Sequence, residues 1–173
     1  MIEKEDLRSV VPHRGKMLLL TRVKCYNLEE RSITTEYDIT KDCLFYDPEL
    51  DGVPAWAGFE FIAQSISAIS GIRDREMGMK PKFGFILSVS SMRIDLPFFK
   101  TGSTAEIKTE QIERMDSVYI FHGEINVEGK KILEGKLTVI DIDDEQFEAI
   151  KKGAFNFVTL NDHLNNMMAL IHR

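Results

Sequence analysis

The chain has 173 residues, of which 43% are hydrophobic, and this is enough for one domain with a sizeable core. Its formal net charge of -6 argues against general affinity for nucleic acid, because such binding relies on basic stripes that neutralise phosphates. No apolar run approaches the roughly 18 residues that a membrane span needs, and the charged N-terminus lacks a signal-peptide core, so we expect a cytoplasmic protein without membrane contact.

The first part of the chain predicts a short helix, a hairpin and a loop. Residues 5–10 mix polar and apolar side chains ahead of Pro12 and are expected to be helical. Residues 17–26 form an apolar run, and in residues 31–40 every second side chain is apolar or β-branched, which is typical of paired strands. Prolines and acidic residues in the segment 43–54 predict an irregular loop.

A long helix is predicted next, from about residue 54 to the region of Met77, and it carries one unusual pair of polar side chains. Most of its residues are apolar or small, but Glu60 and Gln64 lie four positions apart and therefore share one face. A carboxylate in such surroundings must be hydrogen-bonded or paired, or its pKa rises. Glu60 is therefore the leading candidate for general acid–base chemistry.

Four strands follow the helix, over residues 83–93, 104–114, 117–127 and 130–141. One helix can bury its apolar surface only if the sheet curls around it, so we predict an α+β fold with an antiparallel sheet wrapped around one long central helix. We assign residues 1–143 to this domain. Residues 144–173 are expected to add two helices, over 144–152 and 160–172, that pack on it.

The apolar segment 82–87 lacks strict alternation, so it is expected to be covered on both faces. A symmetric homodimer that continues the sheet would provide this cover, and a higher assembly stays open.

The order of these elements and three short motifs resemble the hotdog-fold β-hydroxyacyl-ACP dehydratases of the FabA/FabZ group, over about residues 7–141. The first motif is Pro12-His13-Arg14 followed by an apolar run, and the second is Glu60-Phe-Ile-Ala-Gln64. The third is the turn Pro97-Phe-Phe-Lys-Thr-Gly102, which is similar to the family's turn with a proline before a glycine. The divergent ApeP-like branch of this group, which also introduces its helix with Pro-x-Trp, is the closer likeness.

The resemblance implies a dehydratase in which a helix carboxylate and a loop histidine from the other subunit flank the reacting bond of a 3-hydroxyacyl thioester. Glu60 matches the carboxylate. The family histidine lies fourteen residues before the acid, where this chain has Tyr46, and no histidine occurs between Arg14 and Phe121. We therefore predict Glu60 as the main acid–base group, with Tyr46 as an assisting proton donor and Gln64 as a further catalytic residue.

Two alternatives stay open on the same scaffold. A thioesterase would use Glu60 to activate water, with Gln64 and the backbone N–H groups around Ala57 to Phe59 stabilising the oxyanion. A non-catalytic protein would only bind acyl-ACP or acyl-CoA. In each case we expect an acyl carrier protein or CoA thioester as partner. The predicted substrate-binding residues are Trp56, Ala57, Gly58 and Phe59.

The remaining assignments are structural or negative. His13 and Arg14 are expected to order the N-terminal turn rather than to act on substrate. Cys25 and Cys43 have neither CxxC nor histidine spacing around them, so we predict no metal site, no disulfide and no cofactor.

Overall fold

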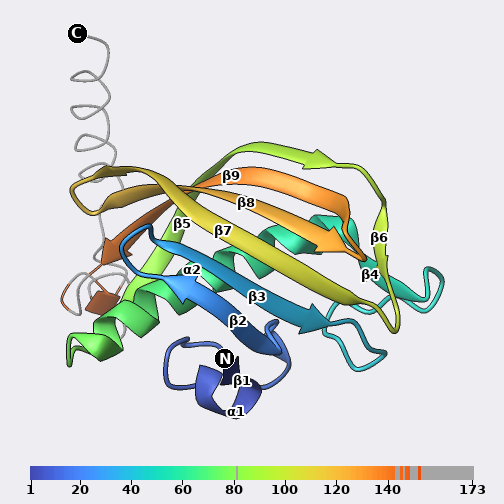
Figure 1. The fold of residues 1–173 in the computed structure, drawn as a ribbon, viewed down its shortest axis with the longest axis horizontal. Coiled ribbons are helices and arrows are strands. Elements are labelled where there is room, and N and C mark those ends of the chain that lie inside the picture. The colour runs from blue at the N-terminus through green and yellow to red at the C-terminus, as the bar shows by residue number, and fades with distance from the viewer. Residues whose placement is uncertain (81, 143–144, 146, 149–151, 153–173) are drawn as a thin grey trace, which may run out of the picture.

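The computed structural model describes residues 1–80 and 82–142, together with residues 145, 147–148 and 152. A seven-stranded antiparallel sheet with the strand order β1-β2-β3-β7-β8-β9-β5 wraps around the long helix α2 (Figure 1). The predicted α+β architecture is therefore confirmed. In chain order the elements are β1 (Ile2–Glu3), α1 (Lys4–Leu7), η1 (Gly15–Met17), β2 (Arg22–Asn27), β3 (Ser32–Asp38), β4 (Gly52–Pro54), η2 (Ala55–Ala57), α2 (Gly58–Glu76), β5 (Phe83–Ile94), β6 (Phe98–Lys100), β7 (Thr104–Met115), β8 (Val118–Val127) and β9 (Lys130–Ile142).

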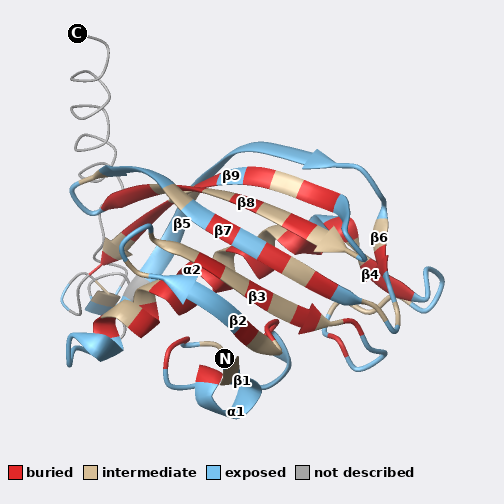
Figure 2. Cartoon of the chain, viewed as in Figure 1, coloured by how far each residue is buried: buried red, intermediate tan, exposed pale blue. Residues whose placement is uncertain are grey.

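The core lies between the concave face of the sheet and α2, as the alternating buried residues of β3, β7 and β8 show (Figure 2). Gly123 of β8 lets the sheet approach closely, because a Cβ atom there would lie 2.6 Å from a methyl carbon of Ile62. One polar bond crosses this apolar layer: the hydroxyl groups of Thr35 and Ser65, both fully buried, lie 2.6 Å apart. The helix is thereby held against β3 in one register.

Three predicted boundaries differ from the structure. The helix expected over residues 5–10 is the four-residue α1, which ends at Leu7. The strand expected over residues 17–26 begins only at Arg22, although Leu18, Leu19 and Leu20 are buried. The physical reason is that the Leu19 amide donates to the side chain of Gln64 on α2 rather than to a neighbouring strand. The loop expected over residues 43–54 ends in a short strand, β4, that pairs with β6 in a separate two-stranded sheet.

The N-terminal segment lies against the side of α2. Val10 and Val11 are buried, and Gly71 of the helix permits their approach, since a Cβ atom at Gly71 would lie only 1.8 Å from the carbonyl oxygen of Val10. Beyond Val11 the chain turns around Arg14. The guanidinium group of Arg14 donates to the carbonyl oxygens of Arg8, Val11 and His13 at 2.9, 2.7 and 2.8 Å.

Strand β5 is one edge of the sheet and pairs only with β9. This edge exposes a row of large apolar side chains, and Figure 2 shows the strand largely in the colour of exposed residues. The exposed apolar residues of the strand are Phe85, Ile86, Val89, Met92 and Ile94. A long apolar edge of this kind is a surface for pairing with another chain.

Several expectations concern residues that the structure describes only in part. The predicted C-terminal helices 144–152 and 160–172 lie almost wholly outside the described residues. Among the described residues, no helix is long and apolar enough to cross a membrane, and no cluster of histidine, cysteine and acidic side chains is suited to hold a metal ion. Cys25 and Cys43 are both free thiols.

Candidate functional site

Glu60 lies in the first turn of α2 and faces a cavity of about 370 Å³ between this helix and the edge strand β5. Helix residues on one side and β5 and β9 on the other form its walls. Apolar side chains supply much of this lining, including Ile66, Phe85 and Val139. The volume lies within the range of small-molecule pockets, about 300 to 1,000 Å³. A carboxylate therefore stands at one end of a largely apolar groove.

Gln64 determines how Glu60 is held. Its side chain is fully buried, and its Nε2 donates to Oε1 of Glu60 at 2.9 Å and to the carbonyl oxygen of Met17 at 2.8 Å. Its Oε1 accepts the Leu19 amide at 2.8 Å. Because the backbone groups of Met17 and Leu19 fix which end of the amide is the donor, Oε1 of Glu60 must act as an acceptor. Oε2 of Glu60 is then the carboxylate oxygen that this bond leaves open towards a bound molecule.

His13 is the second titratable side chain at this end of the cavity. Its Nε2 lies 3.7 Å from Oε1 of Glu60, and the two side chains are 26% and 20% exposed. Its Nδ1 is buried and has no hydrogen-bond partner among the described residues. Burial lowers the pKa of His13, which Glu60 opposes and Arg14 reinforces. At neutral pH the imidazole is therefore mostly neutral beside an acceptor oxygen.

The structure brings Glu60 and Gln64 together, as the helical spacing indicates, but it does not bring Tyr46 to them within one chain. Tyr46 is absent from the lining of the Glu60 cavity, and its hydroxyl donates to Oδ1 of Asp51 at 3.1 Å in the loop that precedes β4. Burial and the neighbouring Asp51 raise the pKa of Tyr46. A role for this phenol at Glu60 would have to come from the loop of a second chain.

The four predicted substrate-binding residues lie just before and at the start of α2, and none of them lines the Glu60 cavity. Trp56 is 51% exposed and packs edge-on against Phe45 at 5.5 Å, whereas Ala57 and Gly58 are buried. The Gly58 amide already donates to the Ala55 carbonyl, because the 3-10 turn η2 runs directly into the helix. This internal bond uses one of the amides expected to form an oxyanion site.

The position of His13 beside Glu60 was not predicted from the sequence. The Pro12-His13-Arg14 motif was visible, but contact with α2 depends on how the N-terminal segment lies along the helix. Buried Val10 and Val11 and the close approach at Gly71 set that position. The glycine in the helix is a signal for close approach, although the sequence does not say which segment approaches.

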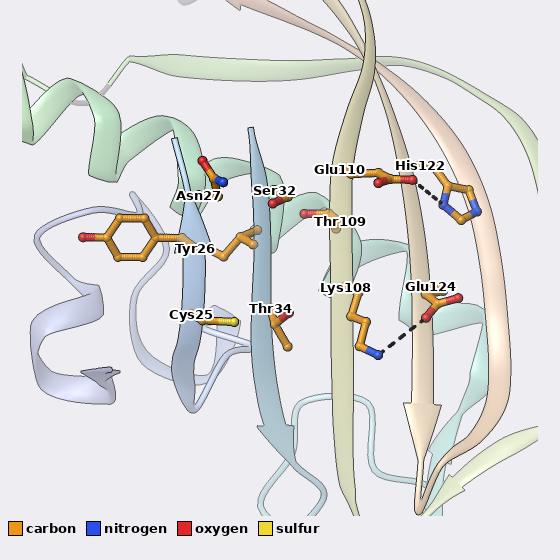
Figure 3. A pocket seen from close by; sticks show the side chains of 11 residues that line it. Cys25, Tyr26, Asn27, Ser32, Thr34, Lys108, Thr109, Glu110, His122 and Glu124 are labelled. Atoms are coloured by element: carbon orange, nitrogen blue, oxygen red, sulfur yellow. Dashed lines mark ion pairs between the residues drawn. The ribbon is translucent and has the colours of Figure 1, made fainter. Parts of the chain in front are cut away.

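A second groove, of about 460 Å³, lies on the outer face of the sheet across β2, β3, β7 and β8 (Figure 3). It also contains a histidine–glutamate pair, with Nδ1 of His122 3.8 Å from Oε1 of Glu110. The Glu110 side chain is 63% exposed, and Nζ of the neighbouring Lys108 lies 3.9 Å from Oε1 of Glu124. Water screens charges of this kind, so the groove is a polar surface rather than a reaction site.

Known proteins share this fold and part of this sequence. A FabZ 3-hydroxyacyl-ACP dehydratase of Erythrobacter litoralis is 28% identical over 142 residues, which are 80% of this chain and 92% of that protein. Among solved structures, a chain of the dehydratase heterocomplex ApeI:P from Xenorhabdus doucetiae matches with a TM-score of 0.74 at 22% identity, over 83% of this chain and 95% of that one. A hypothetical thioesterase of Streptococcus pneumoniae, solved with coenzyme A, matches with a TM-score of 0.54 at 11% identity, over 70% and 84% of the two chains.

These structural likenesses show the hotdog fold, which was predicted. The family itself is shown by the model of the ApeP-like proteins, described as ApeP dehydratase, which matches residues 5–151. Since this match spans most of the chain and includes the helix that carries Glu60, the protein belongs to the ApeP-like dehydratase family.

Proposed function

We propose that the protein dehydrates a 3-hydroxyacyl thioester carried by acyl carrier protein, with Glu60 as its principal acid–base group. The observation that carries this proposal is the carboxylate of Glu60 at the end of an apolar cavity, held there by a buried amide. An acyl chain would lie along the apolar walls, and its C2 and C3 atoms would meet the carboxylate. Membership of a dehydratase family and the FabZ relatives support the reaction class.

The arrangement of Glu60 suits the removal of a proton. Gln64 holds Oε1 as an acceptor, so Oε2 can take the C2 proton of the thioester without loss of that hydrogen bond. Gln64 then acts as a positioning residue, because its donors and its acceptor are occupied by Glu60, Met17 and Leu19.

A thioesterase is the second candidate, and the scaffold likeness to a hypothetical thioesterase is its support. It would need free backbone N–H groups at the helix start for the oxyanion. The Gly58 amide donates within the protein instead, which weighs against this chemistry.

The exposed apolar edge of β5 supports a proposal about partners. A second hotdog chain paired along this strand would cover its exposed apolar side chains and would bring another Tyr46 loop into the assembly. We propose a homodimer in the cytoplasm. The heterocomplex of ApeI and ApeP supports a pairing of this general kind, with a different chain as partner in that case.

The test is incubation of the purified protein with 3-hydroxyacyl-ACP and with saturated acyl-ACP of several chain lengths. A dehydratase forms the enoyl thioester from the first substrate, and Glu60→Gln lowers the rate by about 100-fold or more. Glu110→Gln, which alters the exposed pair on the outer face, is the matched control and keeps the wild-type rate. Release of free thiol from saturated acyl-ACP, or a retained complex without turnover, would overturn the proposal.

A further inference from the structure

Dehydration requires two proton transfers, and Glu60 supplies only one of the groups. A proton leaves C2, and another proton must reach the departing hydroxyl group at C3. We propose that His13 of the same chain is the group that protonates this hydroxyl, so that one chain contains a complete histidine–glutamate pair. This inference rests on the proposed dehydratase function.

The geometry that supports the pair is local and specific. Nε2 of His13 lies 3.7 Å from Oε1 of Glu60, and both side chains line the same cavity between α2 and β5. The distance is longer than a hydrogen bond, as expected for catalytic groups that close on each other only when substrate is bound. The opposite ring nitrogen, Nδ1, is buried without a partner among the described residues, so Nε2 is the atom that exchanges a proton at the cavity.

The dehydration step needs one exchangeable proton on the His13–Glu60 pair. Oε2 of Glu60 forms an O–H bond as the C2–H bond breaks, and the electrons of that bond become the C2–C3 double bond. The C3–O bond breaks, and the leaving oxygen takes the proton from Nε2 of protonated His13 and departs as water. Glu60 then returns its proton to His13, which restores the starting state.

The surroundings of His13 suit a proton donor. Burial without a partner for Nδ1 makes the imidazolium a stronger acid, while the Glu60 carboxylate keeps the protonated form accessible. Arg14 on its own segment also acts on the charge of His13, and Lys82 ahead of β5 and Asp141 on β9 line the same cavity. The pair is active only with one proton, which His13 carries. Because the pKa of His13 is lowered, this form is a minority at neutral pH. The rate should therefore rise as the pH falls below neutral and fall again once both groups carry a proton, which gives a bell-shaped pH dependence.

The pair on the outer face provides an internal comparison. Nδ1 of His122 lies 3.8 Å from Oε1 of Glu110. The exposed fraction of the His122 side chain, 30%, is close to the 26% of His13. Figure 3 shows this pair in a groove lined by further polar side chains, including Lys108 and Glu124. Only the His13–Glu60 pair stands beside apolar walls that could hold an acyl chain.

The experiment compares His13→Gln with His122→Gln in the full-length protein. With 3-hydroxyacyl-ACP as substrate, we expect His13→Gln to lower kcat by about 100-fold or more and to remove one limb of the pH profile. The urea midpoint should stay near that of the wild type at neutral pH, where the imidazole is neutral. His122→Gln should change neither quantity. The double variant His13→Gln/Glu60→Gln should be little slower than the slower single variant, because the two groups act as a unit.

A second measurement tests the pair without turnover. In an NMR titration, Glu60→Gln should lower the pKa of His13 further, because it removes the carboxylate that opposes burial, and Glu110→Gln should leave it unchanged. An unaltered pKa of His13 in Glu60→Gln, or a kcat within threefold of wild type in His13→Gln, would overturn the role of His13 and leave the dehydratase proposal standing. Absence of enoyl product from the wild-type protein would overturn both.

Discussion

Gly71 is the point at which the N-terminal segment rests on the helix, and Gly71→Ala tests that contact directly. The new Cβ would lie 1.8 Å from the carbonyl oxygen of Val10 and 2.7 Å from the carbonyl carbon. Ordinary contacts begin at about 3.5 Å, so the segment must retreat by roughly 1.5 Å. Such a shift loosens Val10 and Val11, both buried, and moves His13 away from Glu60.

The magnitudes decide the direction of the effect. Alanine in place of glycine within a helix stabilises by about 1 kcal/mol, whereas overpacking costs about 1 to 3 kcal/mol. Partial exposure of two valines, each worth about 1.5 kcal/mol when buried, adds to that cost. We expect a net loss of about 2 kcal/mol, which lowers Tm by about 4 to 8 °C in a chain of this size.

Urea and thermal unfolding followed by circular dichroism would measure this loss. Gly84→Ala is the matched control for stability, because a Cβ atom there meets only the Ile140 carbonyl oxygen at an ordinary 3.8 Å. Its change should stay within about 0.5 kcal/mol. A Gly71→Ala protein as stable as the wild type would refute the close packing of the segment, and with it the physical basis for the position of His13.

Two further predictions concern the edge strand and the buried imidazole. Val89→Lys places a charge in the middle of the exposed apolar edge of β5. It should convert a wild-type dimer into a monomer in sedimentation at micromolar concentration, without loss of the helical circular dichroism signal. A wild-type protein that sediments only as a monomer contradicts the pairing. Because burial lowers the pKa of His13, the unfolded chain binds a proton there more readily, so the free energy of unfolding should fall as the pH drops below about 6.5, until the folded-state pKa is passed. His13→Gln should flatten this slope between about pH 7 and pH 5 in urea titrations, and an identical slope in both proteins would show that other groups cause it.

Local patterns in the sequence were sufficient for the main elements. The long β5, β7, β8 and β9 strands and α2 follow from alternation and from the apolar, small-residue composition of the helix, because these signals come from neighbouring residues. The short strands β4 and β6 escaped detection, since three residues carry little periodic signal and their pairing joins distant segments.

The candidate site divides in the same way. The spacing of Glu60 and Gln64 alone shows that they share one face of a helix. The apolar neighbours of Glu60 in the sequence are likewise enough to expect that its carboxylate has a function. Other features depend on how separate segments pack. These are the hydrogen bonds that join Gln64 to Met17 and Leu19, the hydrogen bond from Tyr46 to Asp51, and the approach of His13 to Glu60.

The sequence by itself therefore determined the α+β class, the central helix and the acidic residue in its first turn, because backbone geometry repeats with a short period that residue patterns follow. Only the tertiary structure decided which side chain stands opposite that acid. Buried valines and a helix glycine set the path of the N-terminal segment, and a contact between segments far apart in the chain leaves no periodic trace in the sequence.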